Sequence, residues 1–130
     1  MRPFLANGRL WRVVEVEPGD PRLIDRTMTE RLATTDPATG TINVSSAVKP
    51  PLLDRVVLHE VAHAVTISYG LVSRLRAALP PELWVFVEEW AAQLVEMHAI
   101  EVSAIASETL GRPVCVHGRC SVELFPGKGV

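Results

Sequence analysis

Two stretches of alternating, β-branched character in the first third of the chain predict strands. Residues 10–16 (Leu-Trp-Arg-Val-Val-Glu-Val) end at the Pro-Gly-Asp-Pro of residues 18–21, which favours a strand closed by a turn. Residues 31–35 and 41–45 repeat this character around a five-residue connection that begins with Asp-Pro and ends with Gly. This second pattern predicts a β-hairpin.

Further along the chain, apolar positions recur at helical spacing. A Pro-Pro pair opens a helix predicted over about residues 51–69, because proline is tolerated in the first turn, and Gly70 suits its C-terminal cap. Residues 72–79 suit a short helical linker. A second Pro-Pro pair opens a long helix from residue 82 to about residue 110, where Gly111 ends it.

The order of these elements predicts the fold class. Strands first and helices second indicate one α+β domain over residues 1–130, with a small antiparallel sheet packed on two main helices. The tail from 114 to 125 alternates around His117-Gly118 and suits a second hairpin. We expect residues 112–130 to form a C-terminal arm that covers a cleft or mediates oligomerisation by β-augmentation, which leaves the oligomeric state open.

Composition narrows the class of protein. The chain has 130 residues, 48% hydrophobic and 22% charged, which fits a globular domain. A net charge of −2 with scattered basic residues argues against a nucleic-acid partner, and no stretch approaches the roughly 18 apolar residues of a membrane span. The N-terminus lacks an apolar signal region, so we expect a cytoplasmic protein with Cys115 and Cys120 reduced.

The residues that carry chemistry are His59-Glu60-Val61-Ala62-His63, a His-Glu-x-x-His motif on the first predicted helix. Positions i and i+4 lie one turn apart on one face, so both imidazoles can reach one metal ion. Glu60 then lies beside the ion, where it can act as the general base toward a zinc-activated water. The alternative to a metal site is an amphipathic helix whose histidines have only a structural role in the core. Buried polar side chains need partners, however, and a metal supplies them.

A catalytic zinc site normally takes a third protein ligand. The branch that supplies a third histidine at fixed spacing is excluded, because its two diagnostic positions are Thr66 and Tyr69 here. The remaining common solution is a glutamate on the following helix. The candidates are Glu88 and Glu89.

A helical wheel separates these two glutamates. Glu88 lies about 60° from the centre of the mainly apolar face, whereas Glu89 lies about 160° away in a polar stripe. We therefore predict Glu88 as the ligand and Glu89 as a solvated charge. The mainly apolar face consists of Trp84, Val87, Ala91, Leu94, Val95, His98, Val102 and Ile105.

The chain resembles the gluzincin branch of zinc peptidases. The resemblance rests on the motif, the hairpin before it and the Glu88-x-x-Ala91 pattern after it. More specifically, the chain resembles small phage and bacterial metallopeptidases of the ImmA/IrrE type. The resemblance implies a zincin-like fold, Zn²⁺ held by His59, His63 and Glu88, and Glu60 as general base. It also implies that residues 41–45 form an edge strand that pairs with an extended peptide substrate. The chain departs from the family pattern at Ala62 and Ala92, where Gly and Asn are common, and offers no assured residue to stabilise an oxyanion.

These observations lead to two functional hypotheses. The first is a zinc-dependent metallopeptidase that hydrolyses a peptide or protein substrate. The alternative is a catalytically degenerate zinc-binding regulatory or interaction module of a phage or mobile element. Two other features are interpreted as structural: His98 as a core histidine, and the Cys115/His117/Cys120 cluster as incidental and not a second metal site.

Overall fold

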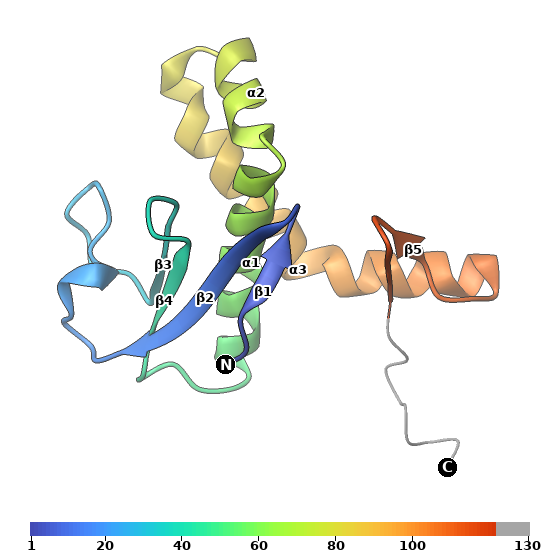
Figure 1. Cartoon of the computed structure of the whole chain (residues 1–130), viewed down its shortest axis with the longest axis horizontal. Coiled ribbons are helices and arrows are strands. Elements are labelled where there is room, and N and C mark those ends of the chain that lie inside the picture. Colours follow the sequence, from blue (N-terminus) through green and yellow to red (C-terminus); the bar gives the residue numbers. More distant parts are fainter. Residues whose placement is uncertain (122–130) are drawn as a thin grey trace. The chain divides into compact units, whose positions relative to one another are not determined.

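The structure is a computed structural model that describes residues 1–121. The remainder of the predicted C-terminal arm, residues 122–130, lies outside the described residues. The chain divides into two compact units, Met1–Glu96 and Met97–Val130, and the long helix α3 runs from the first into the second (Figure 1).

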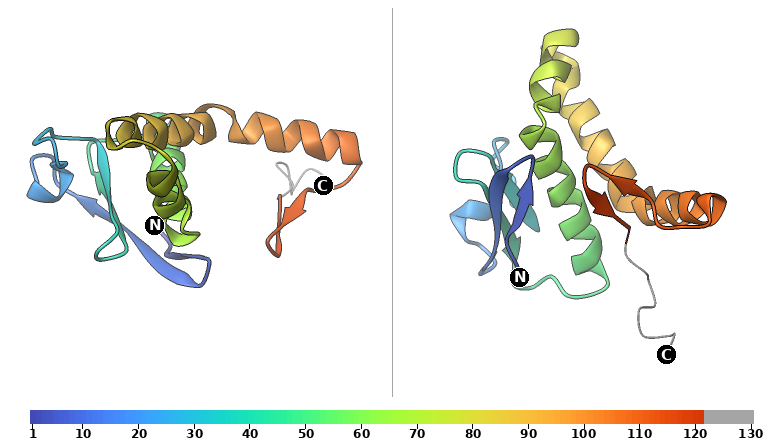
Figure 2. Two further views of the ribbon diagram at one scale, coloured as in Figure 1. Left: turned by 90° about the horizontal axis from the view of Figure 1, so that it is seen from above. Right: turned by 45° about the vertical axis from the view of Figure 1, so that its right-hand side comes forward.

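The expected α+β class is confirmed. A four-stranded sheet packs against helices in the first unit, and Figure 2 shows α1 lying along the sheet. The strands and helices of the described chain are β1 (Phe4–Ala6), β2 (Arg9–Val16), β3 (Ala33–Asp36), β4 (Thr41–Ser45), α1 (Leu52–Ser68), α2 (Leu71–Ala78), α3 (Trp84–Leu110), β5 (Cys115–Val116) and β6 (Arg119–Cys120). Two short 3₁₀ turns, Pro21–Leu23 and Pro81–Leu83, connect them.

The sheet is mixed, whereas the sequence indicated an antiparallel one. Its strand order is β1-β2-β4-β3, with β2 and β4 parallel and the other two pairs antiparallel. Because β4 is paired on both sides, residues 41–45 cannot be the edge strand that the resemblance implied. The two edges are β1 and β3, and β3, the first strand of the predicted hairpin, contacts the motif on α1 through Thr35 and Glu60.

Strand β1 was missed by the sequence analysis. Asn7 and Gly8 join it to β2 with positive φ angles of 50° and 76°, the conformation of a type I′ hairpin turn. An Asn-Gly pair with apolar residues nearby on both sides is a strong hairpin signal, so the sequence did contain the information. The hairpin anchors the end of α1, because Asn7 Nδ2 donates to the Ser68 carbonyl at 3.0 Å.

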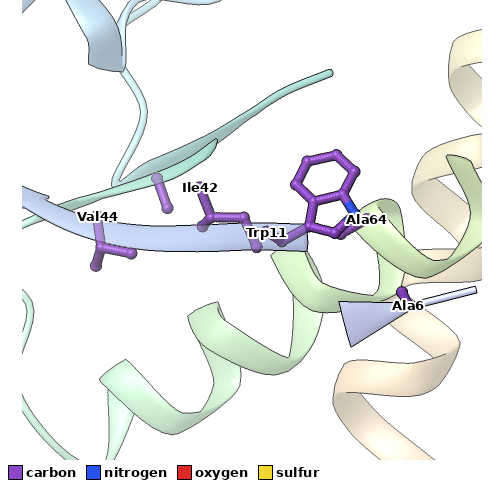
Figure 3. Close-up of a cluster of buried hydrophobic side chains, with 6 residues drawn as sticks. Ala6, Trp11, Ile42, Val44 and Ala64 are labelled. Carbon is purple, nitrogen blue, oxygen red and sulfur yellow. The ribbon is translucent and has the colours of Figure 1, made fainter. Parts of the chain in front are cut away.

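The core lies between the sheet and α1 and is shown in Figure 3. Trp11 is fully buried there together with Ile42 and Val44, and Ala64 of α1 packs against them. The indole nitrogen of Trp11 donates to Ser68 Oγ at 2.8 Å, which satisfies its only polar group. These contacts fix α1 on the sheet and therefore fix the position of the motif.

The helices agree closely with the expected ranges. α1 ends at Ser68, and Gly70 follows in the left-handed conformation before α2 begins at Leu71. Within residues 1–121 no single helix is both long and apolar enough to cross a membrane; α1 and α2, which meet at an angle of 76°, pass that test only as a bent pair.

Helix α3 is much more exposed than the sequence suggested. Of its 27 residues only Ala92 is buried. The face expected to be buried is largely open, since Leu94, Val102 and Ile105 are 47%, 63% and 56% exposed. His98, expected in the core, is also exposed and lies 3.8 Å from Glu101. A further apolar row is exposed on the same helix: Val85, Phe86, Trp90, Met97 and Ile100.

The expected tail hairpin is present in its described part. β5 and β6 pair antiparallel around His117-Gly118, and Ser121 contacts Ser107 of α3 at 3.2 Å. Cys115 and Cys120 form a disulfide across this hairpin, in contrast to the reduced thiols that we expected. Sulfurs joined in a disulfide do not act as thiolate ligands.

Candidate metal centre

Helix α1 presents the two motif histidines side by side. Their ring centroids are 5.0 Å apart with an interplanar angle of 72°, as expected for positions one turn apart. Both side chains are mostly buried, with 18% of His59 and 17% of His63 exposed. The helix that carries them is held on the sheet by apolar contacts, so the pair is fixed before any ligand arrives.

A carboxylate from α3 meets both histidines. The Nε2 atom of His59 lies 3.0 Å from Glu89 Oε2, and the Nε2 atom of His63 lies 3.1 Å from Glu89 Oε1. The ligand atoms of the three side chains all lie within 4.8 Å of one another. This arrangement is compatible with a metal site.

The third member of this group is Glu89, whereas the helical wheel favoured Glu88. Glu88 faces α2 and accepts hydrogen bonds from Arg76, whose Nη2 lies 3.0 Å from Oε1. Arg76 in turn covers the ring of Trp84 at 5.2 Å. The prediction of Glu88 assumed that the apolar face of α3 points to the core. Much of that face is exposed, and the residue that meets the histidines, Glu89, belongs to the polar stripe instead.

The electrostatics of the group follow from this geometry. The pKa of His59 is raised, chiefly by its hydrogen bond with Glu89. Hydrogen bonds with His59 and then with His63 hold the pKa of Glu89 well below the usual carboxyl range. Glu89 is therefore charged at neutral pH and would present its negative charge to a cation bound here.

A second α3 carboxylate, Glu96, orients one of the histidines. Its Oε1 lies 3.0 Å from Nδ1 of His59, and its Oε2 lies 2.8 Å from Nη2 of Arg55. A carboxylate on Nδ1 fixes the ring and leaves Nε2 pointing at Glu89, as is common for metal-binding histidines. Glu96 was not among the residues predicted from the sequence. The signal was its spacing of seven residues, two helical turns, from Glu89.

Glu60 occupies a different environment from the other carboxylates. It is only 9% exposed, and its Oε2 accepts a short hydrogen bond from the Thr35 hydroxyl of β3. A buried carboxylate with one hydroxyl partner keeps free acceptor positions on its oxygens. The structure thus places Glu60 next to the histidine group without making it a member of that group.

A pocket opens beside this group. Its volume is about 220 Å³, and it is lined by Arg31, Leu32, Ala33, Val56, His59, Glu60 and Glu96. Residues from the start of β3 thus face residues of α1 across it. All seven belong to the first compact unit.

The side chains present fit a divalent cation of the zinc type. Two imidazoles and one carboxylate form a common three-ligand set for zinc that leaves a fourth position open. Ligand bonds of about 2.0–2.2 Å in a tetrahedron separate the ligand atoms by about 3.4 Å. The observed separations are 3.0 and 3.1 Å from the histidines to Glu89 and at most 4.8 Å within the group. His59, His63 and Glu89 therefore form a possible metal-binding group.

Comparisons with known proteins find no matching family model, curated protein or solved structure. What fold and site define together is an α+β protein with a possible metal-binding group of two histidines and one glutamate. Glu60 and Glu96 lie next to that group, and the edge strand β3 contacts Glu60 through Thr35.

Proposed function

We propose that this protein is a zinc-dependent metallopeptidase. The observation that carries the proposal is the convergence of the His59 and His63 Nε2 atoms on the Glu89 carboxylate, with Glu60 buried one residue from His59. A His-Glu-x-x-His helix with a glutamate from a later helix is the ligand arrangement of the gluzincin peptidases that the sequence resembles. Glu89 takes the place that the sequence analysis gave to Glu88.

Each residue has a defined part in this proposal. His59, His63 and Glu89 would hold a zinc ion, which when bound would lower the pKa of a water molecule and polarise a carbonyl oxygen. Glu60 accepts a proton from the attacking water and returns it to the leaving amine. Thr35 holds the Glu60 carboxylate in place, and Glu96 keeps the ring of His59 in the binding orientation.

The position of β3 supports a peptide as the substrate. The Ser45 N–H donates to the Leu32 carbonyl, so along β3 the residues alternate between groups turned to β4 and groups turned outward. The outward positions are Ala33 and Thr35. Within the described residues, the backbone N–H and C=O groups of these two residues make no backbone hydrogen bond on the side away from β4. An extended peptide can add to this edge, next to Glu60.

Metal analysis and a cleavage assay test the proposal. The purified full chain should bind one zinc per molecule, and the loaded protein should cleave peptides from a digested-proteome library. Glu60→Gln should abolish cleavage and leave zinc binding intact, whereas Glu108→Gln, at an exposed position at the end of α3, should change neither. Cleavage that persists in Glu60→Gln, or survives complete zinc removal, would contradict the proposal.

A second candidate function is a regulatory or interaction module that binds zinc without turnover. The exposed apolar row of α3, in which Phe86 is 70% and Trp90 57% exposed, favours it, because such rows are typical of binding surfaces. Zinc bound at one equivalent, with no Glu60-dependent cleavage of any library peptide, is the result that would select this candidate.

A further inference from the structure

The pocket beside the histidine group has an uneven lining. Leu32, Ala33 and Val56 form an apolar part, and Arg31 adds a cation next to them. Its volume of about 220 Å³ is enough for one side chain or chain end of a peptide. Because the pocket adjoins both Glu60 and the outer edge of β3, a peptide lying on that edge would place a group in it.

Arg31 is held in place by an ordered turn. Its Nε donates to Asp25 Oδ2 at 2.6 Å. The other oxygen of Asp25 accepts from the Thr27 N–H at 2.8 Å and from the Thr29 N–H at 3.1 Å, and the Thr27 hydroxyl adds a third bond. These bonds hold the pKa of Asp25 well below its usual range, so it remains a charged anchor. The Arg31 backbone is fixed as well, since its N–H donates to the Leu23 carbonyl.

Among the described residues, none accepts a hydrogen bond from the far end of the Arg31 guanidinium. Within residues 1–121 its side chain makes one hydrogen bond, through Nε, which leaves both Nη groups without an acceptor. Arg22 gives a contrast on the same segment, because it binds Asp20 through both Nε and Nη2. An arginine anchored at one end and open at the other is suited to bind a planar carboxylate.

The charge around the pocket allows an anion once a divalent ion is bound. Glu60, Glu89 and Glu96 contribute three negative charges in this region. Asp25, which is paired with Arg31, adds a fourth negative charge. Arg31 and Arg55 together with a divalent ion contribute four positive charges, which balance the four carboxylates and leave no net negative charge to repel an anion. The apolar wall lowers the local dielectric constant, which strengthens an arginine–carboxylate pair.

We propose that the pocket is a carboxylate-binding subsite, in which Arg31 binds a carboxylate of the bound peptide through its Nη groups. The inference rests on the proposed peptidase function, since it names the peptide group that lies beside the metal centre. Two sources share this chemistry: an aspartate or glutamate side chain within the peptide, and the free carboxylate at the peptide's end. Arg31 is a specificity residue in either case.

Small probes can test the subsite without any turnover. Zinc-loaded full-length Glu60→Gln protein, labelled with ¹⁵N, is titrated with three compounds while the backbone amide signals of Leu32, Ala33 and Val56 are followed. N-acetylglutamate N-methylamide carries only a side-chain carboxylate, N-acetylalanine carries only a terminal one, and N-acetylglutamine N-methylamide carries neither. We expect one carboxylate probe to bind about tenfold tighter than the amide probe, as for a hydrogen-bonded charge pair.

Two variants separate Arg31 from general effects. Arg31→Gln should remove the preference for a carboxylate, while Arg22→Gln, which removes a similarly exposed arginine paired with Asp20, should retain it. The stronger carboxylate probe identifies the source. Equal binding of all three probes overturns the inference, and so does a preference that survives Arg31→Gln, because the carboxylate then binds the metal itself.

The zinc content of the same samples keeps this test distinct from that of the proposed function. Protein that binds zinc but shows no Arg31-dependent preference contradicts the subsite alone. Protein that binds no zinc contradicts the peptidase, while the titration still reports on Arg31: a preference lost in Arg31→Gln upholds the subsite, and equal binding of the three probes overturns it.

Discussion

Helices α1 and α3 both supply side chains to the candidate metal centre, but they are attached to the protein in opposite ways. α1 packs its apolar residues, Ala64 and Val56 among them, against the sheet and the buried Trp11. No residue of α3 belongs to that core cluster, and only Ala92 of this helix is buried. Near the site α3 is joined to α1 through charged groups, namely Glu89 and Glu96 with the two histidines and Arg55.

This difference separates the stability of the fold from the formation of the site. The histidines are positioned by the hydrophobic core, whose members include none of the three candidate ligands. The carboxylates are positioned by ion pairs, which are individually weak and partly exposed. A bound cation would therefore hold α3 in position, as the hydrophobic core holds α1. Metal binding should order the contact between the two helices.

The largest expected effect comes from truncating matched tryptophans on the two sides of this comparison. Trp11→Ala should lower the free energy of unfolding by about 3–5 kcal/mol, because it empties a fully buried site and orphans Ser68. Trp90→Ala, at an exposed position of α3, should change it by less than about 0.5 kcal/mol. Urea unfolding measures both. Equal losses would mean that the outer face of α3 is covered.

The next effect concerns the adjacent glutamates of α3. Glu89→Gln should weaken zinc binding by more than about 100-fold, beyond the range typical of residues outside the ligand set. Glu88→Gln should leave zinc affinity nearly unchanged and instead cost about 1 kcal/mol of stability, because it breaks the pair with Arg76. Competition with a chelating dye gives the affinities. The reverse ranking would restore Glu88 as the ligand.

The sequence was most informative where one segment decides the structure. The His59–His63 spacing, the α1 range and the hairpin that contains β3 follow from local periodicity and turn residues, and all three are confirmed. β1 was missed even though its Asn7-Gly8 turn is a local signal. The sequence was least informative about how helices pack on one another.

The choice between Glu88 and Glu89 illustrates that limit. A helical wheel ranks faces by polarity, and this ranking predicts the buried face only when the hydrophobic effect sets the rotation of the helix. Here the rotation of α3 is set by ion pairs with α1 and by Arg76 of α2. Arg76 lies in a segment that the sequence analysis described only as a linker. The same reasoning applies to β4, because its parallel partner β2 is distant in sequence and no local pattern specifies that pairing.

A smaller effect is expected at Glu96, which contacts the site through His59. Glu96→Gln should reduce zinc affinity by about 10–100-fold, since the amide holds the Nδ1 proton less firmly and breaks the charge pair with Arg55. Arg55→Gln removes the outer pair and keeps the Glu96 carboxylate on His59, so it should have a smaller effect on the affinity. If the two variants have equal effects, Glu96 acts through the charge of Arg55 and not through the orientation of the imidazole ring.

The smallest effect is expected at the contact between the sheet and the site, where Thr35 of β3 donates to Glu60. Thr35→Val removes the hydroxyl that donates to Glu60 and keeps the shape of the side chain. If Glu60 is the general base, its looser placement should lower kcat of peptide cleavage by about tenfold, the worth of one hydrogen bond to a charged group. Zinc affinity should not change, because Thr35 contacts no member of the histidine group. Thr34→Val, on the neighbouring residue whose hydroxyl donates to the Arg22 carbonyl, is the matched control and should leave kcat unaltered. A fall in zinc affinity with Thr35→Val would show that β3 supports the metal ligands as well as Glu60. The view that β3 acts on the base alone would then be incorrect.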